Sequence, residues 1–97
     1  MNRGITEKEF ESQVKELAVK WFGWYYYHPF LSKYSERGFP DLTLLRPPRL
    51  IFAELKSEKG KLTESQARWL WELRKVPGVE VYIWRPRHIE HIAEVLR

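Results

Sequence analysis

The feature that most restricts the fold of this chain is a pair of short apolar runs joined by two prolines. Residues 41–46 (DLTLLR) and 50–56 (LIFAELK) are rich in Leu, Ile and Phe, and Pro47-Pro48-Arg49 connects them. Runs of this length around a tight connection indicate a β-hairpin with antiparallel strands. A further apolar run, residues 79–84 (VEVYIW), follows a helical stretch, so the sheet is predicted to contain a parallel pair as well.

Helix signals surround these strands. Thr6 with Glu9, and Thr63 with Gln66, have the spacing of capping boxes, in which a side chain and a backbone N–H exchange hydrogen bonds at a helix start. Apolar residues at helical spacing follow each box and also follow Pro86. The predicted helices cover residues 7–22, a stretch that starts at Thr63 and stops before Pro77, and a last stretch after Pro86. Trp69, Trp71 and Trp84 are predicted to pack helix against sheet.

The remaining strand is the aromatic run 24–28 (WYYYH), which Pro29 ends, and residues 30–40 are predicted to be a loop. The order α-β-β-β-α-β-α predicts an α/β fold with a mixed four-stranded sheet, helices packed on it, and an extra C-terminal helix. A chain of 97 residues can build one hydrophobic core, so residues 1–97 are expected to form one domain.

Composition excludes several classes of protein. The chain is 43% hydrophobic and 31% charged and has five each of Trp, Tyr and Phe, which is ordinary for a folded soluble protein. It has no cysteine, so disulfides, thiolate zinc sites and a Cys nucleophile are excluded. No apolar stretch is long enough for a membrane span and the first residues lack a signal-peptide core, so a cytoplasmic protein is expected. The net charge of +4 suits a polyanionic partner without requiring one.

Three charged residues in the hairpin predict a reaction centre. Asp41 begins one strand where Glu54 ends the other, so antiparallel pairing brings the two carboxylates to the same end of the sheet. Lys56 shares a face with Glu54 because side chains alternate along a strand. Two carboxylates repel each other, and a hard ion such as Mg²⁺ removes that cost while binding water and phosphate. Lys56 would then stabilise charge on a phosphate or orient the attacking water.

These residues lie in a pattern that resembles the PD-(D/E)xK nucleases. The main parts of the pattern are Gly38-Phe39-Pro40-Asp41, then Ala53-Glu54-Leu55-Lys56, then Gln66. The branch that the chain is similar to is the VRR-NUC domain in the small standalone form carried by phages and prophages. The resemblance covers nearly the whole chain, and its further parts are Thr6-Glu7 with Phe10 and Val14, Gly23-Trp24, Tyr27-His28, Leu42, Arg46-Pro47-Pro48-Arg49, Ser57, Trp69-Leu70 and Trp84-Arg85-Pro86.

The resemblance implies a restriction-endonuclease-like αβββαβ core and roles for particular residues. Asp41 and Glu54 would be ligands of Mg²⁺ or Mn²⁺, together with the backbone carbonyl of Leu55, and Lys56 would be the catalytic base or charge stabiliser. Gln66 would reach the site from the following helix. The family also places an acidic residue of the first helix near the metal; Glu7 is preferred here for its position in the Thr-Glu start, and Glu11 is the alternative because it lies in mid-helix.

The same resemblance implies a function. The chain would be a metal-dependent DNA endonuclease, similar to Holliday-junction resolvases and acting as a homodimer, in a bacterial or phage-infected cell. Residues 24–27 and Phe30-Leu31 are candidate dimer contacts. No small-molecule cofactor or substrate is expected, because no deep pocket is signalled.

Cations on loops around the predicted centre are candidates for phosphate contacts, which give sequence-independent affinity. No recognition helix with base-reading side chains is evident, so structure-selective cutting is expected. The candidate DNA-binding residues are Lys33, Arg37, Lys59, Lys61 and His28.

Simpler interpretations stay open for several of these residues. Asp41 could be a turn residue, and Glu54 and Lys56 could be the exposed face of an edge strand. Gln66 could serve only its capping box and Glu7 only the helix dipole. For the whole chain, the alternatives are a non-catalytic nucleic-acid-binding module of the same fold and a nuclease acting on flaps or single strands.

Overall fold

The structure, a computed structural model, describes residues 4–29 and 36–97. Its elements follow the predicted order of helices and strands. In chain order they are α1 (Glu7–Lys15), the π-helix η1 (Glu16–Trp21) that continues it, β1 (Tyr25–Tyr27), β2 (Leu42–Arg46), β3 (Arg49–Leu55), α2 (Glu64–Arg74), β4 (Val79–Trp84), the 3-10 helix η3 (Pro86–His88) and α3 (Ile89–Leu96).

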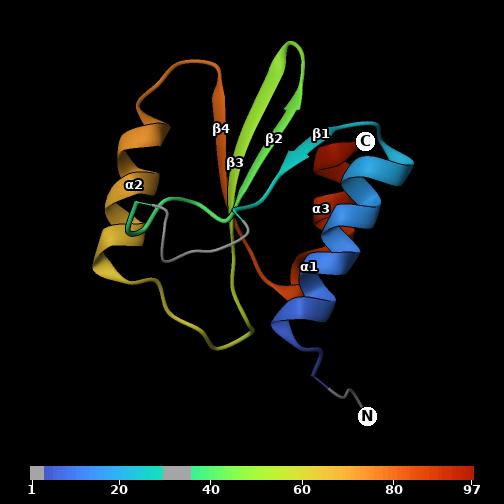
Figure 1. Ribbon diagram of the computed structural model, residues 1–97, viewed down its shortest axis with the longest axis horizontal. Helices are drawn as coiled ribbons and strands as arrows, with labels where there is room; N and C mark the ends of the chain where they lie inside the picture. Colours follow the sequence, from blue (N-terminus) through green and yellow to red (C-terminus); the bar gives the residue numbers. More distant parts are fainter. Residues whose placement is uncertain (1–3, 30–35) are drawn as a thin grey trace.

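The four strands form one mixed sheet with the order β1-β2-β3-β4. β1 with β2 and β2 with β3 are antiparallel, whereas β3 and β4 are parallel and are connected through α2. Helices α1 and α3 lie on one side of the sheet and α2 lies on the other, as Figure 1 shows in a view along the sheet. The predicted α/β class, mixed sheet and C-terminal helix are therefore confirmed. Within the described residues, no helix is both long and apolar enough to cross a membrane.

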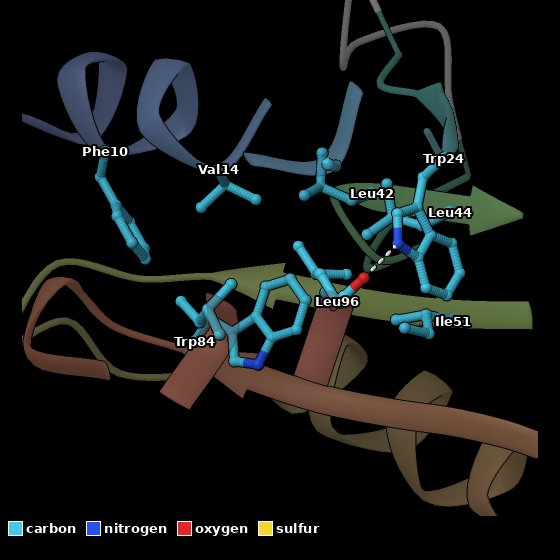
Figure 2. Packing of buried hydrophobic residues seen from close by; sticks show 11 residues of the cluster. Phe10, Val14, Trp24, Leu42, Leu44, Ile51, Trp84 and Leu96 are labelled. Atoms are coloured by element: carbon cyan, nitrogen blue, oxygen red, sulfur yellow. Dashed lines mark hydrogen bonds between the residues drawn. The ribbon is translucent and has the colours of Figure 1, made fainter. Parts of the chain in front are cut away.

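The main hydrophobic core lies between the sheet and the pair α1 and α3 (Figure 2). Phe10 and Val14 of α1 meet the buried side of β2 and β3, and Trp84 of β4 is 1% exposed beside them. Alternation along the strands decides which residues face this core, because successive side chains point to opposite faces. The core residues of β2 and β3 are Leu42, Leu44, Ile51 and Ala53.

Two arginines of the hairpin turn hold the end of α3. Arg46 Nη1 donates to the carbonyl oxygen of Leu96 at 3.0 Å, and Arg49 Nη1 donates to that of Val95 at 2.8 Å. Both guanidinium groups lie over the ring of Trp24, whose Nε1 also donates to Leu96 at 2.9 Å (Figure 2). The last carbonyls of a helix have no partner within the helix, so these contacts satisfy groups that burial would otherwise leave unpaired.

The three tryptophans predicted to pack helix against sheet do not behave alike. Trp84 is buried, and Trp69 meets Phe39 edge to face with ring centroids 5.0 Å apart. Trp71 is 64% exposed, so its predicted packing role was wrong. Residues two apart on a helix point in different directions, and α2 turns Trp69, not Trp71, towards the loop and sheet.

Gly38 allows the loop before β2 to pack on the first turn of α2. Its backbone has a φ of +84°, in the left-handed region that glycine tolerates. A Cβ atom at this position would lie 2.5 Å from the carbonyl carbon of Ser65 and 2.8 Å from the amide nitrogen of Gln66, so the two backbones are in direct contact. The contact fixes the segment leading to Asp41 against the helix that carries Gln66.

We predict that Gly38→Ala destabilises the protein more than Gly78→Ala. Both glycines have a φ of +84°, so both substitutions carry the same backbone strain of about 1–2 kcal/mol. Only Gly38 adds a backbone clash, because no atom lies within 4 Å of a Cβ at Gly78. Urea denaturation of the two variants measures the difference, and equal losses of unfolding free energy would contradict the packing described for Gly38.

Candidate functional site

The register of the hairpin brings Asp41 and Glu54 together. Leu42 is paired with Ala53 across the antiparallel strands, so the preceding Asp41 lies opposite Glu54 at the end of the ladder. Asp41 Oδ2 accepts a hydrogen bond of 2.9 Å from the backbone N–H of Leu55. This contact holds the Asp41 carboxylate against the last residues of β3, at the end of the sheet that the sequence predicted.

Glu54 is the buried charged residue of the described core, with 1% of its surface exposed. Its Oε2 accepts a hydrogen bond of 2.9 Å from Gln66 Nε2. Its Oε1 is buried and has no hydrogen-bond partner among the described residues. Burial, followed by the negative charge of Asp41, raises the pKa of Glu54 to about 8, although the positive charge of Lys56 opposes the shift. A carboxylate in this state favours a proton or another cation beside it.

Gln66 serves the helix cap and the site at once. Its Oε1 accepts a hydrogen bond of 2.9 Å from the backbone N–H of Thr63, which completes the capping box of α2. Its Nε2 donates to Glu54. The two interpretations of Gln66 are therefore compatible, because the amide oxygen accepts a hydrogen bond at the helix cap while the amide nitrogen donates one to Glu54.

Lys56 follows β3 directly and joins the same cluster. Its backbone N–H donates to the carbonyl oxygen of Trp84 at 2.9 Å, which extends the parallel ladder by one residue. Its side chain is partly buried, and its charge acts on the Glu54 carboxylate. The interpretation of Glu54 and Lys56 as an exposed edge-strand face does not hold, because β3 is an inner strand and Glu54 is buried.

A pocket of about 400 Å³ opens beside Asp41, between the first helix and the ends of β2 and β3. Glu7 and Glu11, the two candidate acids of the first helix, both border it. Glu11 Oε2 lies 3.0 Å from His28 Nε2, whereas Glu7 is exposed in the first turn of α1. Among the described residues, its lining is Glu7, Lys8, Phe10, Glu11, His28, Asp41 and Leu55.

Within residues 4–29 and 36–97, no three His, Cys, Asp or Glu side chains are grouped so that they alone could hold a metal ion. A cation at this site would have to combine the two carboxylates of Asp41 and Glu54 with a backbone carbonyl, water or substrate oxygen. Mg²⁺ is commonly bound in that way, with one or two carboxylates and several waters.

The predicted DNA-binding cations are spread over two loops. Arg37, Lys59 and Lys61 are exposed, and Arg85 holds the loop that carries the two lysines by donating to the carbonyl oxygens of Ser57 and Gly60. His28 borders the pocket beside Asp41. Lys33 and the candidate dimer contacts Phe30 and Leu31 lie outside the described residues.

Tyr26 is a site neighbour that the sequence reasoning did not single out. It is paired with Leu44, so its side chain points to the core side of the sheet, and its hydroxyl is buried without a hydrogen-bond partner in the described part of the chain. Burial and the nearby carboxylates of Glu11 and Asp41 raise its pKa. Alternation along β1 could have placed Tyr26 on this face, but only the packing of α1 shows which side chains it meets.

Comparisons with known proteins agree with this geometry. The family model of the VRR-NUC domain matches residues 6–87, and the chain therefore belongs to this nuclease-like family. A solved structure described as a VRR_NUC domain protein shares the fold, with a TM-score of 0.73 and 20% sequence identity over 96% of this chain and 86% of that one. A search of the curated proteins gave no match.

We predict that burial of Glu54 makes the metal-free protein less stable as the pH rises. The pKa of Glu54 is 4.5 in the unfolded chain and is raised to about 8 in the folded protein. Its contribution to the free energy of unfolding is therefore complete below pH 4.5 and is lost as the pH rises through about 8. The loss has a slope of at most about 1.4 kcal/mol per pH unit. Urea denaturation in EDTA across this range measures it.

The Glu54→Gln variant should remove this part of the pH dependence, because an amide does not titrate. The exposed Glu72, which pairs with Lys75 on α2, offers a matched control, and Glu72→Gln should keep the slope of the unmodified protein. A Glu54→Gln variant with an unchanged slope would show that Glu54 does not bind a proton on folding.

Proposed function

We propose that this protein is a Mg²⁺- or Mn²⁺-dependent endodeoxyribonuclease that hydrolyses phosphodiester bonds. The observation that carries the proposal is the pair of carboxylates, Asp41 and Glu54, opposite each other on antiparallel strands, with Lys56 beside them. Membership of a nuclease-like family supports the same conclusion independently of the side-chain geometry.

The residues present suit a hard divalent cation. Glu54 Oε1 is a buried oxygen without a hydrogen-bond partner in the described part of the chain, and the Asp41 carboxylate raises the cost of its charge. Asp41, Glu54 and the backbone carbonyl of Leu55 would hold the ion together with Glu7, or with Glu11 as the alternative; both glutamates border the pocket from the side of α1. When bound, such an ion polarises a phosphoryl oxygen and makes a bound water more acidic.

The chain's own residues prepare the site for this chemistry. Gln66 keeps the Glu54 carboxylate in position through its hydrogen bond, and the backbone N–H of Leu55 does the same for Asp41. Lys56 supplies a fixed positive charge that would stabilise the negative charge developing on a phosphate, or orient the water that attacks it. These groups are placed by the start of β2, the end of β3 and the first turn of α2.

The expected substrate is DNA chosen by its structure, with branched or junction DNA as the preferred form. The exposed Arg37, Lys59 and Lys61 can contact phosphates, which carry no sequence information. A two-fold symmetric dimer would match the symmetry of a four-way junction.

The test is cleavage of junction, flap and linear duplex DNA with Mg²⁺, with Mn²⁺ and with EDTA. We expect metal-dependent nicking, strongest on the junction. Asp41→Asn, Glu54→Gln and Lys56→Ala should each lower the rate at least about 100-fold, as removal of a charge-stabilising group typically does. Glu72→Gln and Lys75→Ala remove an exposed ion pair at the C-terminal end of α2 and should leave the rate unchanged.

Other outcomes identify the alternatives. Intact DNA that is nevertheless bound in every condition would show a non-catalytic binding module. Strong cutting of flaps or single strands with an intact junction would show a nuclease of another specificity. Circular dichroism of each variant must match that of the unmodified protein, so that lost activity is not lost folding.

The proposed homodimer has support at the free edge of the sheet. β1 is an edge strand, and Tyr25 lies opposite Leu45 on the side of the sheet away from the main core. These side chains are 75% and 40% exposed, so together they form an apolar surface beside the outer edge of β1, which pairs with no second strand among the described residues.

Light scattering should give about twice the chain mass of 11.8 kDa. Tyr25→Lys combined with Leu45→Lys should give the monomer mass, because two lysines disfavour close strand contact. Trp71→Lys, which changes another exposed aromatic residue on α2, should leave the dimer intact. A monomer at all working concentrations would exclude the dimer.

A further inference from the structure

A second hollow, of about 630 Å³, runs along the seam between α1 and the edge strand β1. It adjoins the pocket beside Asp41, because Lys8, Glu11 and His28 border both. The two hollows therefore form one groove, called here the α1–β1 groove, with Asp41 at one end. Its outer part is lined by Lys8, Glu11, Ser12, Lys15, Tyr26, Tyr27 and His28.

One face of α1 makes a polar wall for this groove. Lys8, Ser12 and Lys15 are spaced by four and three residues, which places them on the same side of a helix. All three are exposed. The two lysines stand about 10 Å apart along the helix axis, at 1.5 Å per residue.

Among the described residues, Lys8 and Lys15 make no ion pair that would compete with a ligand, in contrast to Lys20 and Lys75. Lys20 pairs with Glu16, and Lys75 pairs with Glu72. Within residues 4–29 and 36–97, neither Lys8 nor Lys15 makes an ion pair; Lys15 only lies over the ring of Tyr26, 5.5 Å from its centre.

The charges of the groove are arranged in two parts. Glu11 carries the negative charge of the outer part, and its carboxylate is already engaged by His28 at 3.0 Å. Two ammonium groups therefore outnumber one carboxylate there, while Glu7 and Asp41 place negative charge at the other end. A cation-binding end that continues into an ammonium-lined end suits a polyanionic chain, with one phosphate at the cation and the next ones at the lysines.

We propose that the α1–β1 groove binds the sugar–phosphate backbone of one nucleic-acid strand beside the bond to be cut, with Lys8 and Lys15 contacting its phosphates. This proposal rests on the proposed nuclease function and names the path of its substrate. The lysines stand about 10 Å apart along the helix axis, so they can contact different phosphates of one strand. Ser12, between them, offers a hydroxyl donor to the same backbone.

The test is binding without cleavage, measured by fluorescence polarisation in EDTA with a labelled single strand and, separately, with a duplex of the same sequence. The Lys8→Ala, Lys15→Ala double variant should bind about tenfold more weakly. The slope of log affinity against log salt, between about 50 and 200 mM, should become shallower by about 1.4 for the single strand or about 1.8 for the duplex, for two lost phosphate contacts.

The matched control is the Lys20→Ala, Lys75→Ala double variant, which removes the same charge from positions outside the groove. Its affinity and salt slope should stay close to those of the unmodified protein. A loss of affinity and of salt slope in the groove variant alone supports the proposal. The probe whose binding becomes weaker shows whether the groove holds a single strand or a strand of a duplex. Equal losses in both variants, or none in the groove variant, would overturn it.

This outcome is separable from that of the proposed function. Binding in EDTA requires no hydrolysis, so the groove can be confirmed even if Asp41→Asn and the unmodified protein prove equally inactive. Conversely, the unmodified protein could show metal-dependent nicking while the Lys8→Ala, Lys15→Ala variant keeps its full affinity for DNA. That result would support the nuclease function and reject the α1–β1 groove as the path of the substrate. Circular dichroism should show both double variants folded.

Discussion

The antiparallel pairing of β2 with β3 is the interaction on which the rest of the structure depends. Its register, with Leu42 opposite Ala53, sends four apolar side chains to the face covered by α1 and α3. The same register leaves Asp41 opposite Glu54 at one end of the hairpin. A slip of one residue would reverse the faces of one strand, and would separate the carboxylates at the same time as it exposed the core. Core and site are thus consequences of one alignment.

The two ends of this hairpin have opposite electrostatic roles. At the turn, Arg46 and Arg49 satisfy the last carbonyls of α3 and stack on Trp24, so their charges are used for structure. At the other end, Glu54 is buried next to Asp41 with one oxygen that no described group satisfies. Burying a charge is costly unless it is paired. Among the described residues, Glu54 is the buried charged group, and Gln66 and Lys56 compensate the cost of its burial in part. Groups that are costly to bury in this way are common at functional sites.

Local signals in the chain were sufficient for most of the secondary structure. The two capping boxes, the prolines and the apolar runs predicted the order of helices and strands, and the ends differ by one or two residues when α1 is taken together with η1 and η3 with α3. The change from α-helix to π-helix at Glu16 was not predicted. The meeting of Asp41, Glu54 and Lys56 also followed from the sequence, because a hairpin brings together residues at known spacing. Trp71 was misjudged, since an apolar residue on a helix can face solvent. Spacing made both Glu7 and Glu11 candidates for the site, and both border the same pocket.

By itself, the sequence determined the order of elements, the hairpin and the partners within it, because all of these depend on contacts between residues close in the chain. The tertiary structure alone decided how deeply Glu54 is buried, that Gln66 divides its amide between the cap and that carboxylate, and that Tyr26 lies beside Glu11. It also decided that Lys8 and Lys15 line a groove leading to Asp41. These features require α1, α2 and the sheet to be packed against one another, and packing between distant segments depends on the shapes of all the side chains involved at once.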